Sequence, residues 1–271
     1  MPIVKAIYLG FNPELVRRNG VYHDLSQVLA KLSSSFEEVH RLITVSIKWK
    51  PKGKFLVQNA RSVFLVGNDF TPQKDPSPPF FEGQPELAEM LVKSGEAAGL
   101  WIEGTEVGGI TVSEWELFKL LAPEHRKVLP ISLSQMSPEA HRKWGIAVKK
   151  GGQKWSEPMG ILVTGSLSYR PDLLNLNPSL SNQTDGLPEQ SKNALSDAKK
   201  FDEEVIRIFT SGSFNQMDEM NRDLFKAAQP EGGLASHYFL WGVLGDKAKG
   251  KLEYYSTPST GTGCAVFSFS I

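Results

Sequence analysis

The stretch Gly160 to Ser166, GILVTGS, decides the fold class, because a short apolar run ends there abruptly in small residues. Such a run predicts a buried strand followed by a tight turn. Four more apolar runs, at 2–9, 42–47, 63–67 and 128–133, predict further strands, and amphipathic segments with helical spacing occupy 25–34, 86–98, 111–121, 137–149, 198–210 and 216–228. This alternation predicts an α/β fold, a single domain with a central mixed β-sheet flanked by helices.

The boundaries of several segments carry their own signals. Ser137 and Pro138 have the residue types preferred at the N-cap and first position of a helix. Residues 171–191 are rich in Pro, Asn, Ser and Gln and show no periodicity, which predicts a long irregular loop. Residues 251–271 predict two short strands, so Gly261-Thr262-Gly263 is interpreted as a hairpin turn rather than a nucleotide site.

Composition excludes several classes of protein. The 271 residues include 30 Lys and Arg and 30 Asp and Glu, so no net charge favours nucleic acid or an anionic membrane. Cys264 is the only cysteine, which rules out an internal disulfide and a thiolate metal cluster. No apolar run is long enough for a membrane span and no secretory signal is visible. We therefore expect a cytoplasmic protein that binds neither nucleic acid nor membrane.

Common catalytic motifs are missing from the sequence. There is no phosphate loop, no GxGxxG after a strand, no HExxH and no GxSxG. Only five histidines occur, and His237 lies in the apolar run 236–244, where a core histidine is expected. Taken alone, these patterns indicate an α/β domain and no specific chemistry.

Five short segments nevertheless look like motifs that occur together in this order in a known family. They are LGFNP at 9–13, VSIKW at 45–49, TGSLSYR at 164–170, EGGL at 231–234 with WGVLG at 241–245, and GTG at 261–263. They resemble motifs of the class III extradiol ring-cleaving dioxygenases, whose catalytic chains are similar to the protocatechuate 4,5-dioxygenase catalytic subunit. The family motifs are a His-Pro pair, a Ser-x-His-Trp pattern, a Ser-Gly-Asp-Leu-Ser-His-Arg segment, a Gly-rich turn with a Glu, and a closing strand. The resemblance spans residues 1–271 and implies one domain of that fold.

In active members of this family, two His and the Glu hold Fe(II), and a third His is the acid–base group. The resemblance puts Asn12 and Lys48 at the positions of the iron-binding His, Tyr169 at that of the catalytic His and Gly233 at that of the Glu, with Glu231 as the nearest carboxylate. Asn is a weak neutral ligand, Lys offers no lone pair, and Tyr is a poor base at neutral pH. The resemblance therefore implies a vestigial pocket with no catalytic or metal-binding residue.

A further family motif, Asp-His-Gly, corresponds to Glu106-Val107-Gly108-Gly109, so a substrate-contacting His is also missing. Lys48 either faces solvent, pairs with a carboxylate, or fills the position of the metal and stabilises the empty pocket.

The chain most resembles the α subunit of the 2-aminophenol 1,6-dioxygenases, in which a shorter chain without iron ligands assembles with a longer, iron-bearing β chain. The resemblance implies an α2β2 heterotetramer that cleaves 2-aminophenol between C1 and C6 to 2-aminomuconate 6-semialdehyde, using Fe(II) in the β subunit and O₂, in aminophenol or nitrobenzene degradation. This chain would support its homologous partner and be inactive alone. Candidate interface residues, each equally compatible with a core position, are Phe80, Phe81 and Trp101, together with the 171–191 loop.

Two other classes of function stay open. The first is a metal-free enzyme that acts alone, with Lys48 as nucleophile or Tyr169 as acid; such a lysine requires burial or a cationic neighbour. The second is a protein that binds a small molecule or another protein in the remodelled pocket without catalysis.

Overall fold

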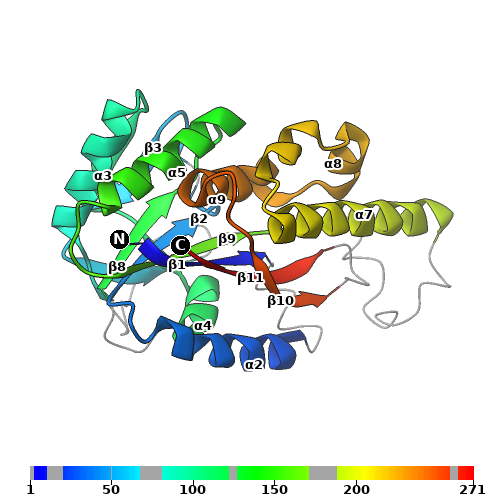
Figure 1. Cartoon of the computed structure of the whole chain (residues 1–271), viewed down its shortest axis with the longest axis horizontal. Coiled ribbons are helices and arrows are strands. Elements are labelled where there is room, and N and C mark those ends of the chain that lie inside the picture. The colour runs from blue at the N-terminus through cyan, green and yellow to red at the C-terminus, as the bar shows by residue number, and fades with distance from the viewer. Residues whose placement is uncertain are drawn as a thin grey trace.

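A computed structural model describes residues 3–10, 21–49, 51–67, 81–121, 127–170, 188–256 and 262–271. The fold is built on an eight-stranded mixed sheet (Figure 1). Its strands are, in spatial order, β10 (Lys251–Ser256), β11 (Cys264–Ser270), β1 (Ile3–Gly10), β9 (Met159–Gly165), β2 (Arg41–Ser46), β8 (Lys127–Ser132), β3 (Phe55–Gln58) and β6 (Ile102–Thr105). A second sheet holds β5 (Phe81–Glu82), β4 (Ser62–Val66) and β7 (Gly109–Thr111).

The predicted strand at 160–166 is β9, and it is parallel to both of its neighbours, β1 and β2. The apolar runs at 2–9, 42–47 and 128–133 are also strands of the central sheet, as predicted. The run at 63–67 is a strand as well, but β4 belongs to the second sheet. Strands β3 and β6 were not predicted, because each is only four residues long and no clear alternation sets it apart.

Helices cover both faces of the central sheet (Figure 1). On one face lie α3 (Pro85–Ala97), α5 (Pro138–Gly152), α7 (Glu189–Ser211), α8 (Arg222–Ala228) and α9 (Ala235–Leu244), and on the other lie α2 (Val21–Ser33) and α4 (Val112–Leu121). Short 3₁₀ turns occupy Ser34–Phe36, Phe214–Glu219 and Glu231–Leu234. This is the predicted single α/β domain with a mixed sheet between helical layers. None of the described helices is both long and apolar enough to cross a bilayer.

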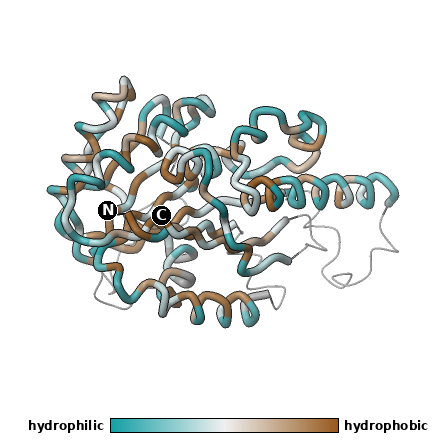
Figure 2. The backbone as a smooth tube through the Cα atoms, viewed as in Figure 1, coloured by the Kyte–Doolittle hydropathy of each residue, from teal (hydrophilic) through white to brown (hydrophobic). Residues whose placement is uncertain are grey.

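Each face of the sheet has its own hydrophobic core, because successive side chains of a strand point to opposite faces. In β9, Ile161 and Val163 belong to the core beneath α5 and α9, whereas Leu162 belongs to the core beneath α2 and α4. Figure 2 shows hydrophobic residues along the central strands and mixed hydropathy around the covering helices. The near-continuous apolar sequence of β9 is therefore explained by burial on both faces.

Helices α5 and α9 pack unusually closely, and two glycines make this possible. A Cβ atom on Gly145 would lie 2.0 Å from the Phe239 carbonyl oxygen, and one on Gly242 would lie 2.1 Å from that of Arg142. A side chain at either glycine would therefore push the two helices apart. Their close contact positions α9, and with it the turn that precedes α9.

Most helix predictions agree with the structure, and the differences have local causes. Ser137 caps α5 as predicted, its hydroxyl accepting a hydrogen bond from the amide of Ala140 at 3.2 Å. The predicted helix at 216–228 is instead a 3₁₀ turn followed by α8, because the Asn221 side chain caps a new helix. The predicted loop 171–191 extends too far, since α7 begins at Glu189; residues 171–187 lie outside the described residues.

A buried carboxylate ties α7 to the loop after β9 and to the last strand. Asp202, fully buried on α7, accepts hydrogen bonds from the amide of Ser168 at 2.7 Å and from the hydroxyls of Ser168 at 3.1 Å and Tyr255 at 3.3 Å. The amide of Gly263 in turn donates to the Ser168 hydroxyl at 3.0 Å. Burial raises the pKa of Asp202 to about 7, and the hydrogen bonds from Ser168 and Tyr255 offset only part of this effect.

The raised pKa predicts a specific pH dependence of stability. Unfolded Asp has a pKa near 4, so between about pH 4 and pH 7 folded Asp202 keeps a proton that the unfolded chain has lost. Its contribution to the free energy of unfolding is therefore present in full below pH 4 and falls as pH rises through 7, by on the order of 4 kcal/mol. Asp202→Asn, which cannot titrate, is expected to lose this decline. Urea denaturation of both proteins across this pH range measures the free energy of unfolding. Equal slopes of that free energy against pH in the two proteins would contradict the prediction.

Candidate functional site

The positions singled out in the sequence gather at one edge of the central sheet. Strands β1, β9 and β2 are parallel, with Gly10 paired to Gly165 and Val45 to Val163, so their carboxyl ends lie side by side. Lys48 follows β2 and Tyr169 follows β9. Ligand sites of open parallel sheets are commonly found at this edge. Asn12, which follows β1 in the sequence, lies outside the described residues.

An ion pair between Lys48 and Glu231 is the main feature of this edge. The Lys48 ammonium donates to Glu231 Oε1 at 2.7 Å, and the two side chains are 26% and 11% exposed. The two residues are 183 positions apart in the sequence. Of the three alternatives for Lys48, the structure therefore shows the pairing with a carboxylate, and that carboxylate is the one nearest in sequence to Gly233.

Two serine hydroxyls hold the backbone on either side of this pair. Ser46 Oγ accepts a hydrogen bond from the amide of Lys48 at 3.1 Å, and the buried Ser166 Oγ accepts one from the amide of Glu231 at 2.8 Å. Both serines lie at the carboxyl end of a parallel strand. The ends of these strands thus fix the backbone positions of Lys48 and Glu231.

The turn from Glu231 to α9 has a left-handed backbone. Gly232, Gly233 and Leu234 have φ angles of 71°, 61° and 68°, and Leu234 is one of two non-glycine residues with positive φ in the described ranges. A bulky residue in this region is strained and persists only where the surroundings impose it. Gly233 is exposed, carries no side chain and offers nothing to the site, whereas the turn directs Glu231 toward Lys48.

Tyr169 is anchored by its backbone. Its amide donates to the carbonyl of Ala228 at 2.7 Å, just before the left-handed turn, and it forms an isolated bridge with Thr262. The predicted hairpin turn at 261–263 thus joins the site through Thr262, while Gly261 lies outside the described residues. Tyr169 is therefore held near the same turn as Glu231.

A buried tyrosine–histidine pair, which sequence reasoning did not identify as part of the site, lies within the same sheet edge. Tyr8 Oη and His237 Nε2 are 3.1 Å apart, and both side chains are almost fully buried. Burial, followed by the charges of Asp202 and Glu231, raises the pKa of Tyr8, while burial lowers the pKa of His237 to about 3. The pair is therefore neutral near pH 7. His237 is a core histidine, as expected.

A buried carboxylate on the opposite side of the sheet secures the strands beneath the site. Glu114 on α4 accepts hydrogen bonds from the Thr164 hydroxyl at 2.9 Å and from the amide and hydroxyl of Thr111. Thr164 Oγ1 also lies 3.1 Å from the carbonyl oxygen of Val45. This network connects β9, β2 and α4, and no signal in the sequence identified it.

The aromatic residues proposed for an interface differ in exposure. Phe81 is buried in the core beneath α2 and α4, whereas Trp101 is 65% exposed at the start of β6, the edge strand of the central sheet. Phe80 lies outside the described residues. The 106–109 segment ends at β7, where Gly108 fits closely against the ring of Trp49.

The charged groups that meet at this edge are one ammonium and one carboxylate. Lys48 contributes an ammonium with three N–H donors and no lone pair, and Glu231 contributes a carboxylate already engaged by that ammonium. Across the described ranges, no three His, Cys, Asp or Glu side chains come together in a way that suits a metal ion. The arrangement can donate hydrogen bonds and balance charge.

Comparisons with known proteins agree with the sequence motifs. The family model described as the catalytic LigB subunit of aromatic ring-opening dioxygenase matches residues 39–268. Among solved structures, the uncharacterized protein JW3007 from Escherichia coli K12 matches with a TM-score of 0.65 at 12% identity, over 98% of this chain and 99% of that one. No curated protein gave a match.

The structural likeness is too distant in sequence to show more than a shared fold. The family model, however, covers most of the chain, including the segments that carry Lys48, Tyr169 and Glu231. The mixed sheet and the meeting of these residues at one edge agree with this match. The chain therefore belongs to the LigB family of aromatic ring-opening dioxygenases, which are of the class III extradiol type.

Proposed function

We propose that this chain is the non-catalytic α subunit of a heteromeric 2-aminophenol 1,6-dioxygenase. In that role it binds and supports a homologous, iron-bearing β subunit, with an α2β2 assembly expected. The observation that carries the proposal is the Lys48–Glu231 ion pair, since the resemblance puts Lys48 at the position of an iron-binding His.

The residues present do not fit a ferrous ion. A facial triad needs two neutral imidazoles and a carboxylate with lone pairs available to the metal. At the second of these positions stands the Lys48 ammonium, whose charge would repel the cation, and its protons engage the carboxylate of Glu231. Gly233 supplies no ligand. The pair instead balances its own charge, which would stabilise a pocket without metal.

Catalysis is accordingly assigned to the partner. The reaction proposed for the complex is the Fe(II)- and O₂-dependent opening of the 2-aminophenol ring between C1 and C6, which gives 2-aminomuconate 6-semialdehyde. No step is assigned to a residue of this chain. Its contribution is a rigid fold and an interface, for which the exposed Trp101 on the edge of the sheet is a candidate.

The ion pair also weighs against a metal-free enzyme with Lys48 as nucleophile. A reactive lysine is favoured by burial without a counter-charge or by a cationic neighbour. Lys48 instead has an anionic neighbour 2.7 Å away, whose carboxylate accepts a hydrogen bond from its ammonium. A supporting subunit is the function that this environment suits best.

The proposed role predicts that activity depends on the partner chain. Purified alone, this protein is expected to show no ring cleavage of 2-aminophenol, and co-expressed with the catalytic chain encoded by the same organism it is expected to copurify and raise that chain's activity. The readouts are size-exclusion chromatography and the absorbance of the ring-opened product. A stable, separate monomer together with a partner that is fully active without it would overturn the proposal.

The charge-balancing role of the ion pair predicts a coupled effect on stability. Lys48→Met removes the ammonium that donates to the nearly buried Glu231 carboxylate and is expected to lower the free energy of unfolding by about 2 kcal/mol. Adding Glu231→Gln should restore part of this loss, since the charge of the carboxylate is removed. Urea denaturation of the single and double variants measures the coupling.

The matched control is Lys54→Met, which breaks the more exposed ion pair between Lys54 and Glu103. An exposed pair of this kind contributes less than about 1 kcal/mol. Unchanged stability in Lys48→Met would show that the ion pair does not support the pocket.

A further inference from the structure

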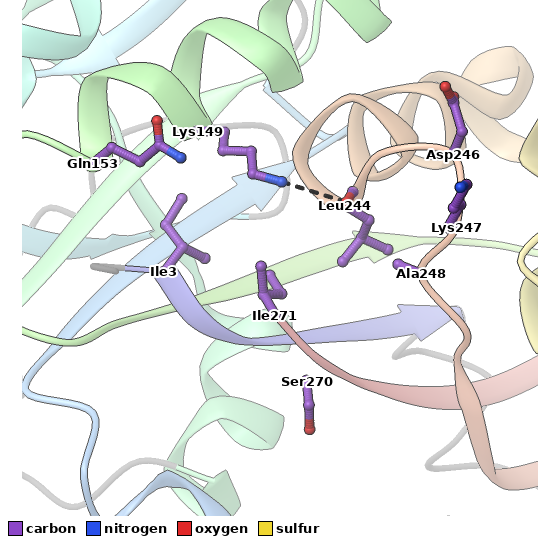
Figure 3. A pocket seen from close by; sticks show the side chains of 9 residues that line it. All are labelled: Ile3, Lys149, Gln153, Leu244, Asp246, Lys247, Ala248, Ser270 and Ile271. Carbon is purple, nitrogen blue, oxygen red and sulfur yellow. Dashed lines mark hydrogen bonds between the residues drawn. The ribbon is translucent and has the colours of Figure 1, made fainter.

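A pocket lies at the opposite end of the central strands from the Lys48–Glu231 pair. It has a volume of about 590 Å³ and is formed where β1 begins, β11 ends and α9 ends (Figure 3). That volume is within the range of small-molecule sites. Its lining residues are Ile3, Lys149, Gln153, Leu244, Asp246, Lys247, Ala248, Ser270 and Ile271.

One side of this pocket is apolar. Ile3 and Leu244 are buried against the core, and Ala248 and Ile271 are half-buried beside them. Figure 3 shows the side chains of Ile3, Leu244 and Ile271 grouped below Lys149. Such a surface binds the hydrocarbon part of a ligand and gives little to a bare inorganic ion.

The other side is cationic. Lys149 extends from α5 toward the end of α9, where its ammonium donates to the carbonyl of Leu244 at 3.4 Å (Figure 3). Gln153, the C-cap of α5, lies one turn further along the chain. Lys247 is exposed at the opposite rim. Within the described part of the chain, neither lysine forms an ion pair.

Among the side chains of the lining, only Asp246 carries a carboxylate, and this carboxylate is already engaged. Asp246 Oδ1 accepts a hydrogen bond from Trp241 Nε1 at 2.7 Å and one from Arg142 Nη2 at 3.1 Å. Its charge is therefore balanced by Arg142 and not by Lys149 or Lys247. An ammonium has three protons to donate, and the long contact with Leu244 engages only one of those of Lys149.

We propose that this pocket binds a small organic anion, a monocarboxylate with an apolar body. Its carboxylate contacts the ammonium of Lys149, with Lys247 adding positive charge at the rim, and its hydrocarbon part packs on Ile3, Leu244 and Ile271. The site is separate from the sheet edge that carries the family motifs, and the inference does not depend on the proposed subunit role.

Benzoate is a suitable probe, because it joins one carboxylate to one apolar ring. In protein with ¹³C-labelled isoleucine methyl groups, benzoate is expected to shift the resonances of Ile3 and Ile271 in a saturable manner with a Kd near ~1 mM. Ile110, which is buried in the other core, should not respond. Benzyl alcohol lacks the charge and inorganic phosphate lacks the apolar body. Each should bind at least about tenfold more weakly than benzoate.

Two substitutions locate the anion. Lys149→Gln is expected to weaken benzoate binding about tenfold, and Lys247→Gln should weaken it by a smaller factor. Lys150→Gln, an exposed neighbour on α5 that does not line the pocket, is the control and should bind as the wild type does. The proposal is overturned if benzoate gives no saturable shift, if benzyl alcohol or phosphate binds as tightly as benzoate, or if both lining variants bind like the wild type.

Discussion

The ion pair between Lys48 and Glu231 is the interaction on which the interpretation of this fold depends. It joins the carboxyl end of β2 to the turn before α9, and each partner is held in place by a serine at the end of a parallel strand. The left-handed turn at Gly232 to Leu234 orients the carboxylate, at a backbone cost of order 1–3 kcal/mol for Leu234. Strain of this kind persists only where surrounding contacts over-determine the backbone, as the packing of α9 on α5 does here.

In the proposed supporting subunit, the family scaffold at this sheet edge is kept while its chemistry changes. The central strands, the buried Glu114 network and the neutral Tyr8–His237 pair all lie beneath the loops after β9 and β2. The ends of the same strands hold the charged pair through the Ser46 and Ser166 hydroxyls. In the proposed supporting subunit, the Lys48 ammonium stands in for a metal cation above these strands.

The sequence predicted those parts of the structure that depend on local patterns. Long apolar runs located β1, β2, β8 and β9, and the Ser137-Pro138 signal located the start of α5. The four-residue strands β3 and β6 were missed because so few residues give no clear period. Residues 189–191 were predicted as loop from their composition. They form the first turn of α7 instead, because the later turns of this helix pack on the core.

The site was predictable only in outline. The motifs indicated which segments would meet, and pairing with a carboxylate was one of the alternatives for Lys48. Which carboxylate would pair with Lys48 was not predicted, because Glu231 is 183 residues away and the conformation of the glycine turn decides which of its residues faces Lys48. The burial of Asp202 and the pairing of Tyr8 with His237 are likewise properties of the packed fold and have no local signature.

The claim at the centre of this account is that the Lys48–Glu231 pair takes the place of an iron site. Its most direct test is the iron content of the protein after anaerobic incubation with Fe(II) and removal of excess metal, alone and in complex with the catalytic chain. No stoichiometric iron is expected in the isolated protein, and in the complex iron is expected only in proportion to the partner. One equivalent of iron retained by the isolated protein would contradict it.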